Sequence, residues 1–245
     1  MGSETPGVAK RVVILQSNYI PWKGYFDLMR SADEFVILDE VQFTRRDWRN
    51  RNLIKTQHGL QWLTIPVTAK GTQKINEIQI SEPGWHLTHW KTISRSLCRA
   101  RYFEQYENEL HQAYLAAGDM QFLSQINLSF LTLISRLLGI ATRITQSIDY
   151  EAPAERTTRL LSICQMTHAS EYISGPAAKT YLDEELFNQA GISVRWFDYE
   201  GYPAYPQLFG EFEHRVTVLD LLSNTGPNAL QYLVREPKTE SDQST

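Results

Sequence analysis

Arg11-Val-Val-Ile-Leu-Gln16 is a short apolar run rich in β-branched residues, a pattern typical of a strand buried in a parallel sheet. A loop follows, and Pro21 suits the first turn of a helix that we expect to end near residue 31. A second apolar run, Phe35-Val-Ile-Leu38, comes next. A strand, a helix and a strand within about 30 residues predict a βαβ unit with parallel strands and a right-handed crossover.

The rest of the chain continues with alternating strand and helix patterns. Apolar runs and alternation predict strands at 60–67, 74–80, 141–148, 172–175 and 192–197. A helical period begins at Trp85 and continues in helices predicted at 106–117, 122–138, 153–168, 181–190 and 217–222. We therefore predict an α/β fold with a mostly parallel sheet. It forms a single domain at 10–235, with a helical elaboration at about 85–140 and disordered tails at 1–9 and 236–245.

Composition limits the classes of protein to which the chain can belong. Its 245 residues are 42% hydrophobic and 21% charged, which describes a globular chain with a substantial core. The net charge of −4 gives no general attraction for nucleic acid or anionic lipid. Two cysteines, Cys98 and Cys164, make no disulfide framework and fit a reducing compartment. No apolar run is long enough for a membrane span and no signal sequence is recognisable at the start, so we expect a cytoplasmic protein.

A basic segment follows the second predicted strand directly. Asp39-Glu-Val-Gln-Phe-Thr-Arg-Arg-Asp-Trp-Arg-Asn-Arg-Asn52 and the nearby Lys55 carry five cationic side chains. Ligands of open α/β sheets bind outside the carboxyl ends of strands, and arginine pairs well with phosphate or carboxylate. The segment is therefore either an anion-binding loop or a solvated loop whose arginines form surface ion pairs. On an acidic chain, such a local cluster favours a small anionic ligand over a long polyanion.

Three side chains are candidates for catalysis, each with a structural alternative. Asp39 could act as a base or metal ligand, or could neutralise the arginine cluster. His89 could be a general base, or a buried and hydrogen-bonded residue beside an apolar helical stripe. Cys164 could be a nucleophile or inert packing. No histidines, cysteines and carboxylates have a recognised metal-ligand spacing, so we predict no metal site and no cofactor.

Several motifs together resemble the pattern of the WbqC-like protein family. They are Gln16-Ser-Asn-Tyr-Ile-Pro-Trp-Lys-Gly-Tyr-Phe26, Asp39-Glu-Val-Gln42, Trp48-Arg-Asn-Arg51, Trp62-Leu-Thr-Ile-Pro-Val67, Tyr172-Ile-Ser-Gly175 with Tyr181-Leu182, and Asp220-Leu-Leu-Ser-Asn224 with Gly226. The similarity extends over residues 12–226. The family occurs in bacterial clusters for O-antigen and other surface glycans, which implies a biosynthetic step on an activated sugar or its precursor.

A second resemblance concerns the layout of the first unit. Trp22-Lys-Gly-Tyr25 opens a helix between two strands, as the His-x-Gly-His motif does in nucleotidylyltransferases. Trp22 and Tyr25 stand where those histidines would be, and indole and phenol are poor substitutes for an imidazole that donates to a phosphate. The resemblance implies a nucleotidylyltransferase-like topology rather than the same reaction.

The motifs and the basic segment together suggest the substrate-binding residues. They are Gln16, Tyr19, Lys23, Gln42, Arg46, Arg49, Asn50, Arg51, Ser174, Gly175, Tyr205, Gln207 and Asn224. Ser174 and Gly175 could offer backbone donors to a phosphate or simply form a tight turn. The aromatic and proline-rich segment 199–212 is long enough to be a lid.

Three hypotheses about function follow. The first is a transferase that joins an acyl or aminoacyl group to a nucleotide-activated amino sugar or similar amine, with an acyl thioester or an acyl carrier protein as a further partner. The second is a nucleotide-using relative of the nucleotidyltransferases, which would need a divalent metal. The third is a non-catalytic interaction or RNA-binding module, for which the net negative charge makes nucleic acid a poor partner. We favour the first hypothesis.

Overall fold

The computed structural model describes residues 9–153 and 155–233, and these residues cluster into two compact units. The sheet unit contains the chain up to Leu15 together with Leu28–Leu38 and Thr142–Asp198. The helical unit contains Gln16–Asp27, Asp39–Ala141 and the chain from Tyr199 onward. A single domain at 10–235 stays a prediction. The predicted tails, 1–9 and 236–245, lie outside the described residues except for Ala9.

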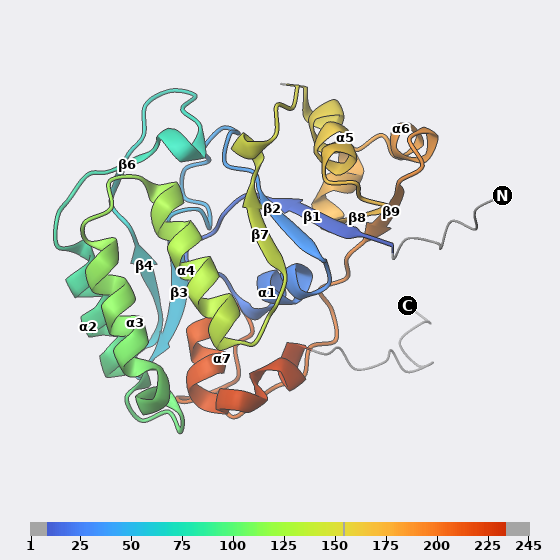
Figure 1. Cartoon of the computed structure of the whole chain (residues 1–245). Helices are drawn as coiled ribbons and strands as arrows, with labels where there is room; N and C mark the ends of the chain where they lie inside the picture. Colours follow the sequence, from blue (N-terminus) through green and yellow to red (C-terminus); the bar gives the residue numbers. More distant parts are fainter. Residues whose placement is uncertain (1–8, 154, 234–245) are drawn as a thin grey trace. The chain divides into compact units, whose positions relative to one another are not determined.

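Five parallel strands form the core of the sheet unit, in the order β7-β2-β1-β8-β9 (Figure 1). Their bounds are β1 Arg11–Leu15, β2 Glu34–Ile37, β7 Arg143–Gln146, β8 Glu171–Ser174 and β9 Ser193–Trp196. The chain runs from β1 outward to β7 and then returns to the other side of β1 with β8, so the winding reverses between β1 and β8. The predicted α/β fold with a parallel sheet and a βαβ start is confirmed.

Helices connect these strands. Helix α1 (Lys23–Arg30) joins β1 to β2, α5 (Arg156–Met166) precedes β8, and α6 (Glu184–Gln189) precedes β9. Glu155 caps α5 by accepting hydrogen bonds from the Thr157 and Thr158 amides. The apolar interior includes Tyr172 of β8, whose ring stacks on Phe187 of α6 with centroids 5.3 Å apart. The sheet unit is thus a short doubly wound layer with its own core.

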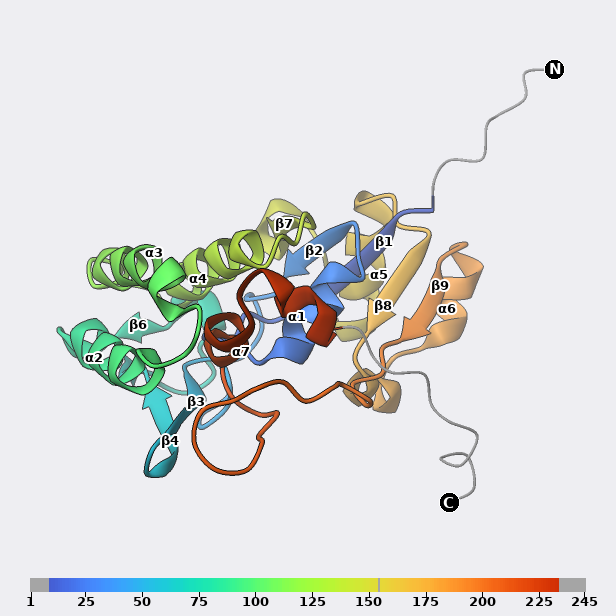
Figure 2. The ribbon, with the colours of Figure 1, turned by 90° about the horizontal axis from the view of Figure 1, so that it is seen from below.

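The helical unit packs helices against small antiparallel sheets (Figure 2). Its elements are β3 Arg51–Thr56, β4 Gly59–Thr64, β5 Val67–Thr68, β6 Gln79–Ile80, α2 Trp85–Leu97, α3 Phe103–Ala117, α4 Leu123–Leu137 and α7 Val218–Thr225. Helix α3 packs against α2, α4 and α7, while α2 also contacts β3. This confirms the predicted helical middle section. No helix in the described residues is long and apolar enough to cross a bilayer.

The structure corrects two predicted elements of this unit. Arg51 and Asn52 do not continue the loop but begin β3, which pairs with β4 as a hairpin with its turn at Gln57 and His58, before Gly59 with φ of 102°. Arg51–Thr56 mixes polar and apolar residues without strict alternation, so no strand pattern is visible in this segment. The strand predicted at 74–80 is instead a 3-10 turn at Ile75–Glu77 followed by β6, because the Glu77 carboxylate accepts from the Lys74 amide at 2.9 Å and caps the turn.

Candidate functional site

Asp39 fixes the course of the loops at the start of the helical unit. Its Oδ1 accepts a hydrogen bond from the Ser17 amide at 2.9 Å, and its Oδ2 accepts from Ser17 Oγ at 2.6 Å. Asn127 of α4 donates to Ser17 Oγ at 3.0 Å. Burial raises the pKa of Asp39, and the hydrogen bonds from Ser17 oppose that rise. Because both carboxylate oxygens already accept hydrogen bonds within the protein, Asp39 joins two loops rather than facing an open cavity.

Arg49 braces the same loops from inside. Its guanidinium donates to Asn18 Oδ1 and, at 2.9 Å, to Gln16 Oε1, while an Asp47 oxygen lies 3.7 Å away. The side chain is only 14% exposed. The Arg49 carbonyl oxygen accepts from Asn127 Nδ2 at 2.9 Å. These contacts place Arg49, which the sequence suggested as a substrate clamp, in a supporting position behind Asn18.

His89 lies in a buried chain of hydrogen bonds. Its Nε2 lies 3.2 Å from the Thr64 carbonyl oxygen, which can only accept, so Nε2 carries the proton. Nδ1 then accepts from the Tyr19 hydroxyl at 2.9 Å, and Tyr19 accepts from Tyr114 at 2.7 Å. Burial lowers the pKa of His89 to about 4, so the ring is neutral at pH 7. This geometry corresponds to the structural alternative for His89, and it also places Tyr19 in the core.

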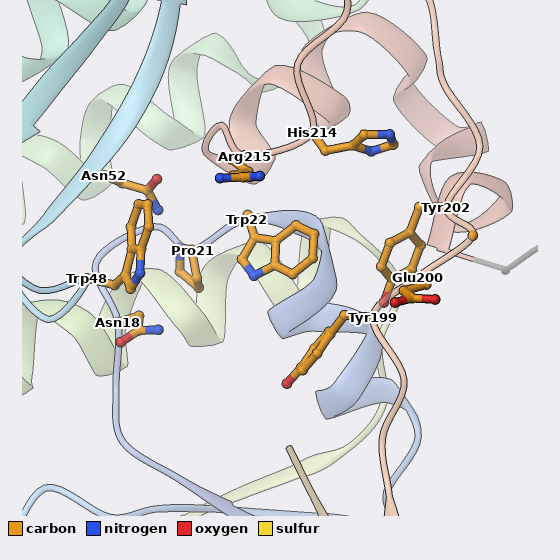
Figure 3. Close-up of a pocket in the computed structure, with 11 residues that line it drawn as sticks. Asn18, Pro21, Trp22, Trp48, Asn52, Tyr199, Glu200, Tyr202, His214 and Arg215 are labelled. Atoms are coloured by element: carbon orange, nitrogen blue, oxygen red, sulfur yellow. The ribbon is translucent and has the colours of Figure 1, made fainter. Parts of the chain in front are cut away.

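The helical unit contains a cavity of about 470 Å³, which we call the aromatic cleft (Figure 3). Its aromatic walls are Trp22, Trp48, Tyr199 and Tyr202. Polar and charged groups lie among them, namely Asn18, Asn52, Glu200, His214 and Arg215. Figure 3 shows the Trp22 ring in the middle, with the Arg215 guanidinium above it and Trp48 beyond Pro21. A flat ligand with an anionic group would find both stacking faces and a cation here.

Trp22 owes its position to its neighbours in sequence and in space. The Asn52 amide donates to the Tyr19 and Ile20 carbonyl oxygens at 3.1 and 2.9 Å and so holds the turn before Trp22, where Ile20 has φ of 36°. A Cβ at Gly24 would lie 2.3 Å from the Trp22 ring, so the indole can keep this place only beside a glycine. The indole lies edge-on to Tyr202 with centroids 5.8 Å apart. The backbone conformation of residues 19–24 and the absence of a side chain at Gly24 therefore fix the position of the Trp22 ring.

His214 and Arg215 provide a base and a cation in the aromatic cleft. Burial lowers the pKa of His214 below its ordinary 6.5, and the positive charge of Lys23 lowers it further, while Glu213 opposes both. His214 is therefore mostly neutral at pH 7 and can accept a proton. Arg215 is exposed and carries its charge at the edge of the cavity. The pair combines a neutral base with a permanent cation.

Lys23 holds the segment 199–215 against the rest of the helical unit. It is 2% exposed, and its ammonium donates to the Pro203 carbonyl oxygen at 2.9 Å. The same nitrogen lies 5.2 Å from the centroids of both Tyr202 and Tyr205 and 5.6 Å from that of Phe212. Burial lowers the pKa of Lys23 to about 8. Lys23 thus anchors the back of the aromatic cleft and points away from solvent.

A second set of buried polar contacts pins the same segment. Lys55 of β3 donates to Gln207 Oε1 at 2.8 Å and to the Glu211 carbonyl oxygen. Asp220 of α7 accepts from the Tyr205 hydroxyl at 2.9 Å and from the Gln207 amide at 2.8 Å. The Asn224 amide donates to the Asp220 carbonyl oxygen at 2.8 Å. Tyr205, Gln207 and Asn224 therefore have structural partners, and motion of 199–212 as a lid would have to break these contacts.

Residues of the 43–52 segment also line a separate cavity of about 580 Å³, which we call the basic cleft. Arg45, Arg46 and Lys70 line it, together with Asn50, Thr68 and Ser81. The Arg45 guanidinium donates to the Ala69 carbonyl oxygen. Arg46 adopts φ of 58°, a left-handed conformation uncommon for a residue other than glycine. Two of the residues predicted to bind substrate, Arg46 and Asn50, therefore lie here.

An exposed aromatic stack extends from the aromatic cleft onto the β3–β4 hairpin. Trp48 and Trp62 are 39% and 42% exposed, and their ring centroids are 5.4 Å apart. The Arg51 guanidinium lies 4.2 Å above the Trp62 ring. We call Trp48, Trp62 and Arg51 the tryptophan stack. Its exposed rings provide a surface on which flat groups could stack.

Comparison with known proteins gives the family. The model of the WbqC-like protein family matches residues 16–232. The chain belongs to the WbqC-like protein family. It is 48% identical over 226 residues to the uncharacterized protein Rv1507c of Mycobacterium tuberculosis, covering 91% of this chain and 97% of that protein. No solved structure matches this WbqC-like chain, so the nucleotidylyltransferase-like layout stays a prediction.

Several other residues predicted from the sequence lie outside both clefts of the WbqC-like chain. Gln42 forms an isolated bridge with Lys74. Ser174 ends β8 and Gly175 follows it in the sheet unit. Cys164 is buried in α5, and its burial raises the pKa of the thiol. A thiol with a raised pKa is a weak nucleophile, which corresponds to the packing alternative. Their roles in binding or catalysis stay predictions.

None of the residues that line the aromatic cleft was among the predicted site residues. Tyr199 and Tyr202 lie in segment 199–212, whose aromatic content suggested a lid, and His214 and Arg215 lie just beyond that segment. Trp22 entered the prediction only through a motif comparison. Nothing in the spacing of this WbqC-like sequence indicates that 18–22 and 199–215 form one cavity.

Proposed function

We propose that this WbqC-like protein is a cytoplasmic enzyme of bacterial surface-glycan assembly. It binds a nucleotide-activated amino sugar in the aromatic cleft and joins an acyl or aminoacyl group to the amine of that sugar. The observation that carries the proposal is the combination of stacking rings, a cation and a neutral histidine in one cavity. The occurrence of the family in surface-glycan gene clusters supports the choice of substrate class.

The dimensions and the lining suit a nucleotide sugar. Pockets for small molecules and cofactors commonly measure about 300–1,000 Å³ and combine apolar walls with a few placed polar groups. The cleft of about 470 Å³ falls within this range. In the proposed complex, the rings of Trp22 and Tyr199 stack on the flat faces of the ligand, and Arg215 pairs with its diphosphate. The oxygen of the Asn18 side chain accepts from Arg49, and its amide nitrogen is placed to donate to a sugar hydroxyl.

The proposed reaction needs one base. The amine of the sugar attacks the carbonyl carbon of an acyl thioester, the C–N bond forms, and the C–S bond breaks. His214 takes the proton that leaves the nitrogen, and the departing thiolate is protonated to the thiol, so that an amide and a thiol are the products. A neutral imidazole suits the first proton transfer. The cleft contributes by holding the amine near this base.

Calorimetric titration with UDP-, dTDP- and GDP-linked amino sugars tests the proposal. We expect saturable binding of at least one of them, and a loss of affinity of roughly tenfold or more in Arg215→Ala, because a charge-assisted hydrogen bond contributes about 1.5–3 kcal/mol. Arg99→Ala is the matched control, since Arg99 is exposed and lines neither cleft. Absence of binding to the whole panel, or equal affinity in Arg215→Ala and wild type, would contradict the proposal.

The tryptophan stack favours a second candidate function, the binding of single-stranded RNA. Exposed rings interleaved with arginine suit stacked bases. Such binding would weaken steeply with salt and would be reduced by Trp62→Ala. Trp62 touches the aromatic cleft only through Trp48, so Trp62→Ala should weaken RNA binding much more than nucleotide-sugar binding.

A further inference from the structure

The basic cleft carries positive charge without neutralisation. Its cations are Arg45, Arg46 and Lys70, and no residue that lines it is acidic. Within residues 9–153 and 155–233, none of the three cations forms an ion pair. A surface loop that served only for solubility would be expected to mix charges of both signs, especially on a chain of net charge −4. These three cations therefore share one cavity and have no acidic partner among the described residues.

The walls of the basic cleft are fixed by contacts that do not use these charges. The Phe43 amide donates to the Gln73 carbonyl oxygen at 2.9 Å and ties the two walls together. Asn50 is 7% exposed and donates to the Ile65 carbonyl oxygen at 2.8 Å. The Arg46 carbonyl oxygen accepts from Arg51, which holds Arg46 in its left-handed conformation. Strained backbone that the surrounding structure maintains is concentrated at functional sites in proteins.

The chemistry of these groups selects phosphate as the ligand. Arginine forms paired hydrogen bonds to phosphate oxygens, and a lysine adds a point charge. The hydroxyls of Thr68 and Ser81 also line the cavity and can donate to the same oxygens. Phe43, Val67 and Ala69 complete the lining, and the cations and hydroxyls among them suit a phosphate group of a ligand.

We propose that the basic cleft is a second substrate site, which binds the phosphate groups of the acyl donor, a phosphopantetheine thioester. This rests on the proposed acyl transfer. The segment 43–52 forms a wall of both cavities: Trp48 and Asn52 face the aromatic cleft, whereas Arg45, Arg46 and Asn50 face the basic cleft. A phosphate held on one side leaves the long flexible pantetheine arm free to carry its thioester to the amine on the other side. The two proposed sites thus share segment 43–52 as part of their linings.

Titration with acetyl-coenzyme A, acetyl-phosphopantetheine and inorganic pyrophosphate tests this proposal on the whole chain. Arg45→Gln keeps a donor for the Ala69 carbonyl oxygen, and Arg46→Asn keeps a residue that tolerates positive φ, so the double variant removes charge with little risk to folding. Each lost charge-assisted contact weakens binding by roughly tenfold or more. We expect that loss for both thioesters in the double variant, and less than twofold change in Arg99→Ala.

Three outcomes overturn the proposal. They are no binding of either thioester to the wild type, equal affinity in the double variant, and binding of pyrophosphate alone. If acetyl-phosphopantetheine binds as tightly as acetyl-coenzyme A, the shared phosphate is recognised and a carrier protein can present it. If only acetyl-coenzyme A binds and depends on Arg45 and Arg46, the free coenzyme is the donor. Nucleotide-sugar titration of wild type and of the same double variant separates the two sites. If the nucleotide sugar does not bind wild type, the proposed function is contradicted. A thioester site that depends on Arg45 and Arg46 would still stand in that case.

Discussion

The substitution Gly24→Ala should separate stability from binding. A Cβ at residue 24 would lie 2.3, 2.6 and 2.7 Å from three atoms of the Trp22 ring, whereas ordinary carbon contacts begin near 3.5 Å. The obstacle is a side chain rather than backbone, so the indole must move by more than about an ångström while α1 can remain in place. We therefore expect the variant to fold with a displaced Trp22.

The expected free energies can be estimated from the contacts. Alanine in place of glycine within a helix stabilises by about 0.5–1 kcal/mol. Displacing the indole loses its edge contact with Tyr202, and such an aromatic pair contributes about 0.5–1.5 kcal/mol. The net change in the free energy of unfolding should therefore stay within about 1 kcal/mol. Loss of a stacking face should cost about 1–3 kcal/mol of binding, which is roughly five- to 150-fold in affinity for a nucleotide sugar.

Urea unfolding and calorimetric titration measure these two quantities on the same protein. Trp22→Ala should lose similar affinity, and the double variant Gly24→Ala/Trp22→Ala should lose little more, since both changes remove the same ring. Unchanged affinity in Gly24→Ala would refute the role given to Trp22. So would additive losses in the double variant, because they would mean that residue 24 acts by another route.

Four further substitutions test separate parts of the account. Lys23 has a folded pKa of about 8 and an unfolded pKa of 10.5. Between these pH values its contribution to the free energy of unfolding should therefore rise with pH, by at most about 1.4 kcal/mol per pH unit. Lys23→Met should remove that slope in urea unfolding. His89 has a folded pKa of about 4 and an unfolded pKa of 6.5, so the free energy of unfolding should fall as pH drops from 6.5 toward 4. His89→Gln should make that fall less steep. An equal slope in the variant would show that His89 is not buried as described. His214→Gln should lower kcat by about 10²–10⁴-fold in an amide-forming assay. The variant should also lack the loss of activity below pH 6.5 that protonation of His214 causes in the wild type. Full activity of the variant would exclude the histidine as the base. Asp39→Asn replaces one accepting oxygen by a donor opposite Ser17 and should destabilise by about 1–3 kcal/mol, and an unchanged urea midpoint would contradict the buried contact.

The fold was largely predictable because local patterns determine it. The apolar run at Arg11–Leu15 marks the buried residues of one strand, and the helical period after Trp85 marks the buried face of one helix. The 3-10 turn at Ile75–Glu77 was missed because one side-chain cap replaced strand pairing. Pattern reasoning therefore succeeded where burial followed a period and failed where a single polar contact decided the backbone.

The site was less predictable because its cations separate in space. Arg49 turns inward onto neutral amides, Arg46 lines the basic cleft and Arg51 lies over Trp62. Lys55, on the same strand as Arg51, is buried against Gln207. The partners of these side chains come from distant parts of the chain, so one basic segment in the sequence became several environments. The aromatic cleft combines segments almost 200 residues apart, whose meeting no local period encodes.

A crystal structure of the protein with a UDP-linked amino sugar would test the central claim most directly. The account predicts electron density for the ligand in the aromatic cleft, with its diphosphate at Arg215 and the sugar amine within hydrogen-bond reach of His214. Density for the nucleotide sugar at the basic cleft or the tryptophan stack, with the aromatic cleft empty at saturating ligand, would contradict it.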